Sequence, residues 1–358
     1  MTPRTVVVHN GARSFGGAER YQVELLRRLQ ERGHRVLFLC RDGSIAERAT
    51  ARGVPAEIGH LGGHLSLPDA ARFAAHLARH RPDALVLGTF KKTWLGGLGA
   101  RLARVPRVIA RIGLATDLPG RGRLYRVAFR RWIDRVVVNA DELRAPVAAS
   151  APELDPARVV VVRNGVEAPA TTLAPGAMRR ALGIPSDALV VGAVARLVPQ
   201  KRLDLLLRAT ARLPGVRCVL AGSGPDEGEL VRLAERLGIS DRVAFLGHRE
   251  DVGDVLSALD LFAVTSRVEG MSNAMLEALA AGVPVLSTPV CGAAEALADG
   301  APAPGQVVED DEEAVAGGMA TLLADRRTLA ERGAAARARA RERFAWSGVL
   351  DRWEELVQ

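Results

Sequence analysis

The sequence predicts an α/β protein built from two doubly wound domains. Short runs of Val, Leu and Ile recur along its 358 residues, and a longer stretch with helical periodicity follows most of them. Continuous apolar strands are typical of parallel sheets that helices cover on both faces. The alternation occurs in two series, and a Pro-, Ala- and Thr-rich stretch without apolar periodicity, residues 167–176, separates them.

The first series predicts an N-terminal domain over residues 1–168. Its predicted strands are residues 5–9, 35–39, 84–88, 107–110, 135–139 and 159–162, and helices such as 18–32, 68–80 and 141–150 lie between them.

The second series predicts a C-terminal domain over residues 177–345 and a final helix over 346–358. Its predicted strands are residues 189–195, 217–221, 243–246, 261–265 and 283–287. Its predicted helices are residues 202–212, 226–237, 251–258, 273–281 and 312–323, and the Ala/Arg-rich stretch 333–343 is also expected to be helical. Ligands of such sheets bind at the carboxyl ends of the strands. We therefore expect the function in the loops that follow strands.

The composition is basic, with 49 Lys and Arg against 41 Asp and Glu. Two interpretations stay open: a bias of the whole chain, or an affinity for anionic partners such as a diphosphate or a membrane surface. A nucleic-acid-binding protein would concentrate its basic residues in a patch with aromatic residues. Because Arg is spread along this chain, we predict no nucleic-acid partner.

The three cysteines, Cys40, Cys218 and Cys291, fit no metal-site spacing and are predicted to be reduced thiols. The Val run after the N-terminus is too short for a signal peptide, and no segment approaches the ~20 apolar residues of a membrane span. We predict a cytoplasmic protein, with the inner face of the plasma membrane as an alternative location.

The most informative motif is Glu269-Gly-Met-Ser-Asn-Ala-Met-Leu-Glu277, which follows a predicted strand and opens a predicted helix. Ser272 or Asn273 is a suitable N-cap, and Gly270 lets the backbone approach a ligand. The free N–H groups and the positive end of the helix dipole favour a diphosphate. Glu277 could accept hydrogen bonds from ribose hydroxyls, and Glu269 from a donor sugar.

A second motif, Arg196-Leu-Val-Pro-Gln-Lys201, follows the first strand of the second series. Its two cations could hold a diphosphate and stabilise it as it leaves. A divalent metal often has this task, and the chain contains no Asp-x-Asp motif that would bind one.

Further strands end in glycine-containing loops, which let backbone N–H groups approach a phosphate, sugar or nucleoside. These loops contain Gly16 and Gly17, Gly222 and Gly224, and Gly247 with His248. None has the Gly-x-Gly-x-x-Gly spacing of a dinucleotide site, which disfavours an NAD oxidoreductase.

Together with Asn164-Gly-Val166, these motifs resemble the signature set of family 4 glycosyltransferases. The resemblance extends from about residue 6 to 297 and is most specific over residues 260–289. It implies the GT-B architecture, two facing Rossmann-like domains with a central cleft, and a final helix that packs back on the first domain. It also implies a nucleotide-diphosphate sugar donor, retention at the anomeric carbon, and neither metal nor other cofactor.

The resemblance also assigns roles to residues. It implies that Arg196, Lys201 and Glu269 are catalytic. The implied donor-binding residues are Gly16, Gly17, Arg196, Lys201, Gly222, Gly224, Gly247, His248, Glu269, Gly270, Met271, Ser272, Asn273 and Glu277.

The acceptor side departs from the family pattern. Many members carry a His-Gly pair after the strand that corresponds to residues 107–110, where this chain has Arg111-Ile-Gly113. We therefore carry over no catalytic His, and predict that Arg111 binds an anionic acceptor or the donor phosphates. Lys91 and Lys92 are further candidates. His9 is either a polar group of the cleft or a turn residue with satisfied hydrogen bonds.

Residues 121–133 mix arginines with Leu, Tyr, Phe, Trp and Ile. Such a basic amphipathic helix can lie on an anionic membrane. The alternative is a domain helix with its apolar side in the core and its arginines in water.

The predicted function is transfer of a sugar from a nucleotide-diphosphate sugar to a hydroxyl on a sugar or lipid-linked acceptor. We expect a role in bacterial cell-surface polysaccharide, lipopolysaccharide or glycolipid assembly. The alternatives are a nucleotide-sugar epimerase and a non-catalytic nucleotide-sugar binding protein on the same architecture.

Overall fold

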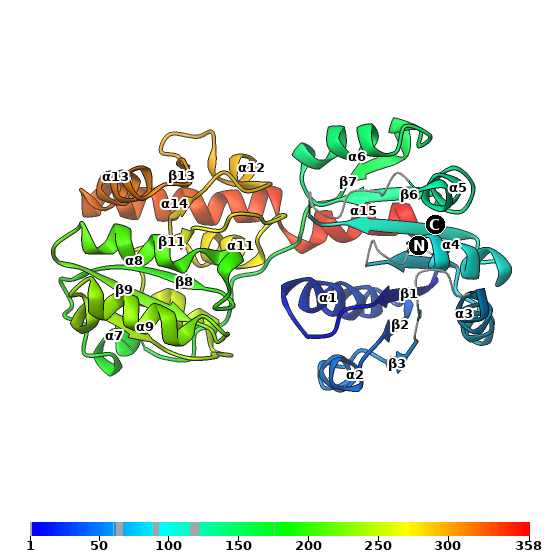
Figure 1. The fold of residues 1–358 in the computed structure, drawn as a ribbon, viewed down its shortest axis with the longest axis horizontal. Coiled ribbons are helices and arrows are strands. Elements are labelled where there is room, and N and C mark those ends of the chain that lie inside the picture. Colours follow the sequence, from blue (N-terminus) through cyan, green and yellow to red (C-terminus); the bar gives the residue numbers. More distant parts are fainter. Residues whose placement is uncertain (1, 60, 62–66, 89–92, 115–121, 175) are drawn as a thin grey trace. The chain divides into compact units, whose positions relative to one another are not determined.

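The computed structural model describes residues 2–59, 61, 67–88, 93–114, 122–174 and 176–358. The chain divides into two compact units. Unit 1 combines Met1–Asn164 with Ser347–Gln358, and unit 2 is Gly165–Trp346. Each unit contains one parallel sheet with helices packed on it (Figure 1).

The sheet of unit 1 has the strand order β3-β2-β1-β4-β5-β6-β7 among the described residues. Its strands are β1 (Thr5–Asn10), β2 (Arg35–Cys40), β3 (Ala56–Ile58), β4 (Ala84–Leu87), β5 (Arg107–Ile112), β6 (Arg135–Val138) and β7 (Val159–Val161). The order reverses between β1 and β4, so this sheet has its topological switch point there.

The helices of unit 1 connect these parallel strands. They are α1 (Gly17–Glu31), α2 (Gly43–Thr50), α3 (Leu67–His80), α4 (Thr93–Leu102), α5 (Arg123–Arg131) and α6 (Arg144–Ser150). Helices α3, α4 and α5 pack side by side. Helix α4 is rich in glycine because it lies close to α3: a Cβ on Gly99 would stand 2.9 Å from Cδ1 of Phe73 and 3.1 Å from the carbonyl oxygen of Ala70.

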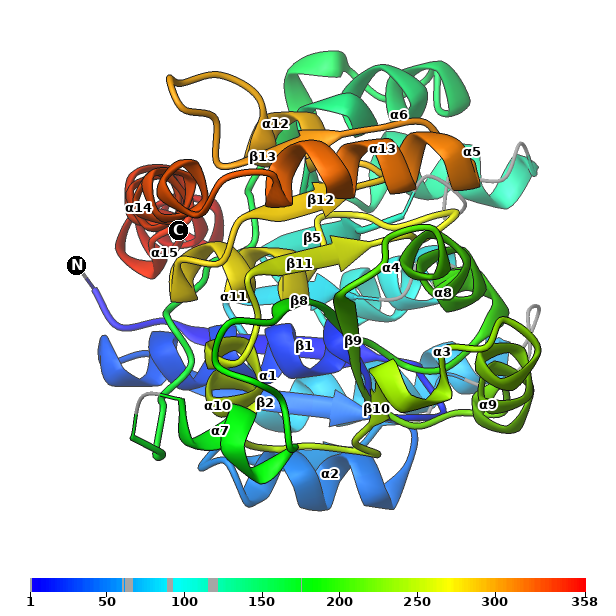
Figure 2. The ribbon, with the colours of Figure 1, turned by 90° about the vertical axis from the view of Figure 1, so that its left-hand side faces the viewer.

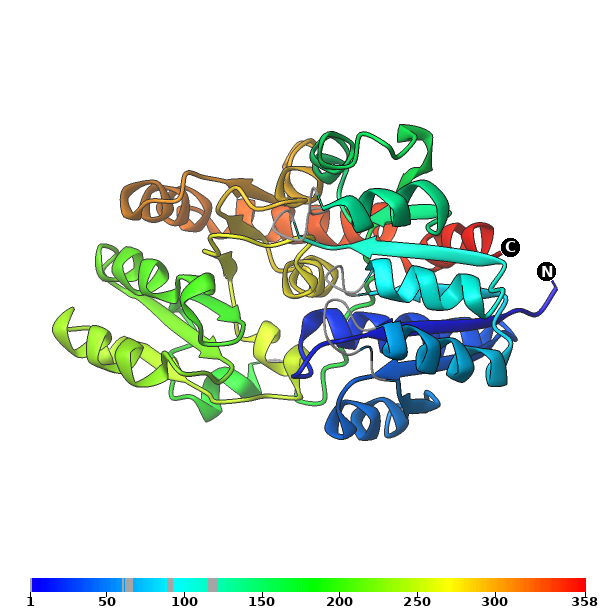
Figure 3. The ribbon, with the colours of Figure 1, turned by 45° about the vertical axis from the view of Figure 1, so that its right-hand side comes forward.

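The C-terminal helix α15 (Trp346–Val357) packs on unit 1, and both chain ends lie on the same side of that unit (Figure 3). The Trp353 side chain is fully buried, and its Nε1 donates to the Tyr21 hydroxyl at 3.2 Å. Buried Glu354 lies 3.1 Å from Nε2 of His34. The helix is therefore part of the unit 1 core.

The sheet of unit 2 has the order β10-β9-β8-β11-β12-β13, which can be followed in Figure 2. Its strands are β8 (Leu189–Val194), β9 (Val216–Ala221), β10 (Val243–Phe245), β11 (Leu261–Val264), β12 (Val285–Ser287) and β13 (Gly305–Val307). Here the order reverses between β8 and β11, which places the switch point of this sheet between them.

The helices of unit 2 are α7 (Ala177–Ala181), α8 (Leu203–Ala211), α9 (Glu227–Arg236), α10 (Val252–Ser257), α11 (Asn273–Ala281), α12 (Ala293–Leu297), α13 (Glu312–Leu323) and α14 (Arg326–Arg343). Buried Leu, Val, Ala and Met side chains of α8, α9 and α13 form one core cluster with β8 and β9. Apolar burial of this kind is the main stabilising contribution.

The predicted α/β class is confirmed, and two short edge elements were missed, β3 and β13. The predicted basic helix is present as α5. Its arginines are exposed, while Ala128 and Phe129 are buried in the unit. Within the described part of the chain, none of the helices combines the length and apolar character needed to cross a membrane.

Candidate functional site

Two predicted site residues meet at the switch point of unit 2. Lys201 follows β8, in the short turn Pro199–Lys201, and Glu269 follows β11. Nζ of Lys201 donates to Oε1 of Glu269, and the hydroxyl of Ser266 donates to the same oxygen at 2.8 Å. Both side chains of the ion pair are mostly buried, with exposed fractions of 17% and 13%. The carboxylate therefore fixes the position of the Lys201 ammonium group.

Backbone contacts hold the two loops together. The Thr265 hydroxyl donates to the Lys201 carbonyl at 3.0 Å, and the Arg267 amide donates to the Gln200 carbonyl at 2.9 Å. Arg196 lies two positions after the end of β8 and is exposed. The strand-end positions thus present one mostly buried and one exposed cation at the same edge of the sheet.

The glycines after β9 allow the neighbouring loop to approach. Gly222 has φ = 145°, and a Cβ there would lie 1.8 Å from the Ala195 carbonyl oxygen. A Cβ on Gly224 would lie 2.1 Å from the Leu197 carbonyl oxygen. The Gly222 amide also donates to the Gly247 carbonyl at 2.7 Å, and the exposed His248 follows that glycine. These glycines shape the loops around the strand ends.

Helix α11 begins at the same edge. Ser272 is its N-cap and accepts a hydrogen bond from the Met275 amide at 3.5 Å. Met271 is buried against Gly292, where a Cβ would meet the Met271 Cε at 2.6 Å. Asn273 is the first helical residue, and Glu277 lies one turn further along, half-buried. The amides of the first turn therefore form a positive dipole end beside the Lys201–Glu269 pair.

A small cavity connects these features. It lies between the carboxyl ends of β8 and β11, at the switch point, where ligands of doubly wound sheets bind. Its polar lining residues are Lys201, Thr265, Ser266, Glu269 and Ser272. Thr265 and Ser266 were not predicted as site residues, and their position directly after a strand is the signal that could have identified them.

Unit 1 has a glycine-containing helix start of its own. Gly16 is the N-cap of α1, and its amide donates to Oε2 of Glu19 at 2.9 Å. Oε1 of the same carboxylate accepts from the Asn10 amide group at 3.0 Å. A carboxylate in the first turn offsets the positive helix end. Gly16 and Gly17 are thus at a strand–helix junction, as expected, but Glu19 already occupies one of the amides there.

Buried polar residues gather at the carboxyl ends of β1, β5 and β7 in unit 1. We call them the unit 1 polar cluster: Asn10, Glu19, Gln22, Arg111 and Asn164. Asn10 donates to Oε1 of Gln22 at 2.8 Å, and Nη2 of Arg111 donates to Oδ1 of Asn164 at 2.8 Å. The sequence analysis identified Arg111 and Asn164 and missed Asn10, Glu19 and Gln22, although these three lie within 12 positions of one another.

Arg111 is only 6% exposed, and its guanidinium lies over the Tyr21 ring, 4.5 Å from the ring centroid. Burial lowers the pKa of this guanidinium, while Tyr21 and Glu19 raise it. Nε of Arg111 and Nε2 of Gln22 have no hydrogen-bond partner among the described residues. Because buried donors are nearly always paired, these two indicate a site for a ligand or water.

The other acceptor candidates are His9, Lys91 and Lys92. His9 is 1% exposed, its Nε2 lies 3.1 Å from the Gly59 carbonyl oxygen, and its ring packs edge-on against Phe73. The assignment of His9 to the acceptor side stays a prediction. Lys91 and Lys92 lie outside the described residues.

Two family models match the chain. The model described as Glycosyltransferase Family 4 matches residues 15–168, and the model described as Glycosyl transferases group 1 matches residues 176–341. One model therefore falls on the first α/β series and the other on the second. Together they span most of the chain.

Two curated relatives are similar over one stretch of the chain. The D-inositol 3-phosphate glycosyltransferase of Mycolicibacterium smegmatis is 43% identical over 177 residues, which are 47% of this chain and 40% of that protein. The protein of the same name from Mycobacterium tuberculosis (strain H37Ra) is 42% identical over 177 residues, or 36% of its length. The match thus spans well under half of each relative.

Solved structures agree with this chain over nearly its whole length. Anabaena HepE in complex with UDP-glucose has a TM-score of 0.84 at 23% identity and covers 98% of both chains. WaaG, a glycosyltransferase involved in lipopolysaccharide biosynthesis, has a TM-score of 0.74 at 20% identity and covers 99% of both chains. At these identities the likeness shows the shared GT-B fold. With two family models on its two α/β series, the chain belongs to the family 4 glycosyltransferases.

Proposed function

We propose that this protein is a retaining glycosyltransferase that moves a sugar from a nucleoside-diphosphate sugar to a hydroxyl acceptor. The Lys201–Glu269 ion pair at the switch point of unit 2 carries this proposal. A cation held by a carboxylate at a strand end, beside the start of α11, fits a diphosphate. HepE, which has the same fold, was solved with UDP-glucose, and this supports the ligand class.

In the proposed reaction the acceptor hydroxyl oxygen bonds to the anomeric carbon on the face from which the nucleoside diphosphate departs. The electrons of the broken C–O bond go to the departing phosphate oxygen, which also receives the hydroxyl proton. Arg196, Lys201 and the amides of the first α11 turn stabilise the charge on that oxygen. Because this chain supplies fixed positive groups for the task, the proposal assigns no step to a metal.

The carboxylates have separate tasks in this proposal. Glu277 accepts hydrogen bonds from the ribose hydroxyls. Glu269 positions Lys201 in the resting protein and contacts the donor sugar when the donor is bound. The hydrogen bonds that the Glu269 carboxylate accepts from Lys201 and Ser266 support the positioning role.

For the acceptor we propose a phosphorylated alcohol that is bound through the unit 1 polar cluster. Buried Arg111 retains an unpaired Nε among the described contacts, and a guanidinium is well suited to phosphate. The mycobacterial relatives are named for D-inositol 3-phosphate, which belongs to this chemical class. A role in cell-surface glycan or glycolipid assembly is part of the same proposal.

The test is a transfer assay with UDP-, GDP-, ADP- and TDP-sugars, in EDTA, against inositol phosphates and matched unphosphorylated alcohols. NMR of the product identifies the anomeric configuration. We expect one preferred nucleotide, a phosphorylated acceptor and retention. An inverted product would refute the mechanism, while sugar interconversion without acceptor would identify an epimerase. Donor binding without turnover for any acceptor would favour a non-catalytic binding protein.

The Arg111 assignment has its own test. Arg111→Lys keeps the charge but loses the planar fork, so we expect the acceptor KM to rise at least about tenfold with a smaller change in kcat. The donor KM is the internal control. An unchanged acceptor KM in a folded variant would remove Arg111 from the acceptor site.

Contact with an anionic membrane stays a prediction for helix α5. Leu124 is 40% exposed beside the arginines of this helix. Co-sedimentation with vesicles of anionic lipid, compared with neutral vesicles, tests it. Recovery of the same amount of protein in the supernatant with both kinds of vesicle would refute the membrane contact.

A further inference from the structure

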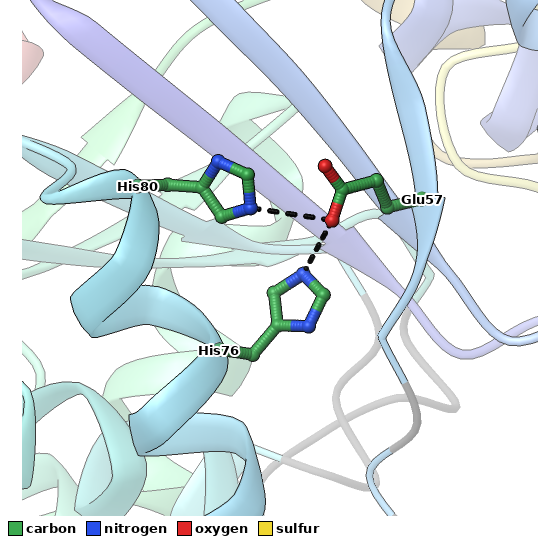
Figure 4. Close-up of side chains that lie close together, drawn as sticks. All are labelled: Glu57, His76 and His80. Atoms are coloured by element: carbon green, nitrogen blue, oxygen red, sulfur yellow. Dashed lines mark hydrogen bonds and ion pairs between the residues drawn. The ribbon is translucent and has the colours of Figure 1, made fainter.

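Three potential metal ligands meet in unit 1, and none of them is assigned to the donor or the acceptor. Glu57 lies in the middle of the edge strand β3, and His76 and His80 lie in the last turns of α3 (Figure 4). Four positions separate the histidines, so they project from one face of the helix. In Figure 4 both rings point towards the Glu57 carboxylate.

The distances between the three ligand atoms are compatible with a shared cation. Oε2 of Glu57 lies 3.0 Å from Nε2 of His76 and 3.2 Å from Nε2 of His80, and one ligand atom from each residue lies within 4.8 Å of the others. Tetrahedral zinc with bonds of about 2.0–2.1 Å separates its ligand atoms by roughly 3.3 Å. The two measured edges are close to that separation.

The orientation of His76 supports the same conclusion. Its Nε2 is buried and makes no hydrogen bond within the described part of the chain, although the Glu57 oxygen is only 3.0 Å away. The contact between this ring nitrogen and the Glu57 oxygen therefore has the distance of an ion pair without the geometry of a hydrogen bond. Ligand atoms around a metal behave in this way, because each is directed at the common centre and not at its neighbours.

We propose that Glu57, His76 and His80 bind a divalent transition-metal ion, with Zn²⁺ as the best match. Two imidazoles and one carboxylate favour zinc over magnesium or calcium, which prefer oxygen ligands. Three protein ligands leave a fourth position for water. The ion fastens the three-residue edge strand β3 to the C-terminal end of α3. It takes no part in the proposed sugar transfer.

Arg79 gives this proposal a distinguishing consequence. Its Nη2 lies 2.9 Å from Nδ1 of His76, which can accept a hydrogen bond only when it carries no proton. A neutral His76 that binds metal through Nε2 carries its proton on Nδ1. Arg79 and the metal therefore compete, and the exposed Arg79 side chain must move away when the ion binds.

The experiment is a calorimetric Zn²⁺ titration of the full chain after removal of bound metal by a chelator, with the metal content counted after dialysis. We expect one equivalent of zinc in the wild type. Binding becomes at least tenfold weaker in Glu57→Gln, His76→Gln and His80→Gln, whereas Arg79→Ala binds more tightly. His248→Gln, which changes an exposed histidine of unit 2, keeps the wild-type affinity.

Circular dichroism establishes that each variant is folded, and Co²⁺ in place of zinc reports a tetrahedral site through its visible absorption. A wild type that takes up no zinc would show that the cluster is only hydrogen-bonded and overturn the proposal. The same stoichiometry and affinity in the three ligand variants would place the metal elsewhere and also overturn it. Because zinc uptake is the readout, neither result bears on sugar transfer.

Discussion

Replacement of Lys201 by Met separates the structural role of this residue from its proposed catalytic role. Methionine keeps most of the length of the side chain and removes the charge, so Glu269 loses its ionic partner but keeps the Ser266 hydroxyl. The contacts around this pair therefore predict two effects in one variant: a lower free energy of unfolding and a lower rate of transfer.

The stability effect follows from the exposure of the pair. Loss of one partner from a fully buried ion pair costs about 3–5 kcal/mol, and exposed pairs contribute about 0.2–1 kcal/mol. With exposed fractions of 17% and 13%, Lys201 and Glu269 lie between these cases. Allowing for residual solvent screening, we expect the free energy of unfolding to fall by about 2 kcal/mol in Lys201→Met.

A second substitution provides the control. Glu269→Gln in the Lys201→Met background removes the uncompensated carboxylate, so about 1 kcal/mol of the loss should return. Transfer should not return with it. We expect turnover of both variants to stay about 10²–10³-fold below the wild type, the usual loss when one group that stabilises a developing negative charge is removed.

Urea unfolding, followed by circular dichroism, gives the stability values, and turnover is measured where every variant is folded. A Lys201→Met variant within about 0.5 kcal/mol of the wild type would show that the ion pair contributes nothing. Near-normal turnover in a folded variant would refute the role of Lys201 in the donor site.

Three further predictions concern the fold. Gly222→Ala should lower the free energy of unfolding by at least about 2 kcal/mol more than Gly215→Ala. Both glycines have positive φ, but only at Gly222 would a Cβ lie 1.8 Å from a carbonyl oxygen. Urea unfolding compares the two variants, and equal losses of stability would contradict the contact. Trp353→Phe should lower the free energy of unfolding by about 2 kcal/mol, because it leaves a cavity and removes the hydrogen bond to Tyr21. An unchanged midpoint of urea unfolding would mean that α15 does not pack on unit 1. Burial raises the pKa of the Cys218 thiol to about 12. The buried thiol therefore contributes fully to the free energy of unfolding below about pH 8.5, the pKa of a thiol in the unfolded chain, and this contribution falls as the pH rises towards 12. The native Cys218 should resist a thiol reagent at pH 8 and react after unfolding, and rapid labelling of the native residue would contradict its burial.

The long elements could be predicted because the apolar run of a strand and the periodicity of a helix are both local signals in the sequence. Helices α11 and α13 begin and end where the periodicity predicted them, at Asn273–Ala281 and Glu312–Leu323. The strand β3 was missed, because Ala56–Ile58 is too short for a pattern. Helix α4 was missed for another reason: its glycines lower helix propensity, and only tertiary contacts explain them, such as that of Gly99 with α3.

The candidate site divides in the same way. Lys201 and Glu269 each follow a strand, so topology alone predicted that they would lie at one edge of the sheet. Their direct ion pair could not be predicted, since the side chains are 68 positions apart. The Glu57–His76–His80 group was missed although His76 and His80 have helical spacing, because the third member comes from a strand that the sequence did not reveal.

The most direct test of the account is calorimetric titration of the full chain with UDP, GDP, ADP and TDP in EDTA, repeated on Lys201→Met and Glu277→Ala. We predict that the wild type binds one of these nucleotides selectively without a divalent metal, and that both folded variants bind it at least about tenfold more weakly. No binding of any nucleotide, or equal binding by wild type and variants, would contradict the proposed donor site in unit 2.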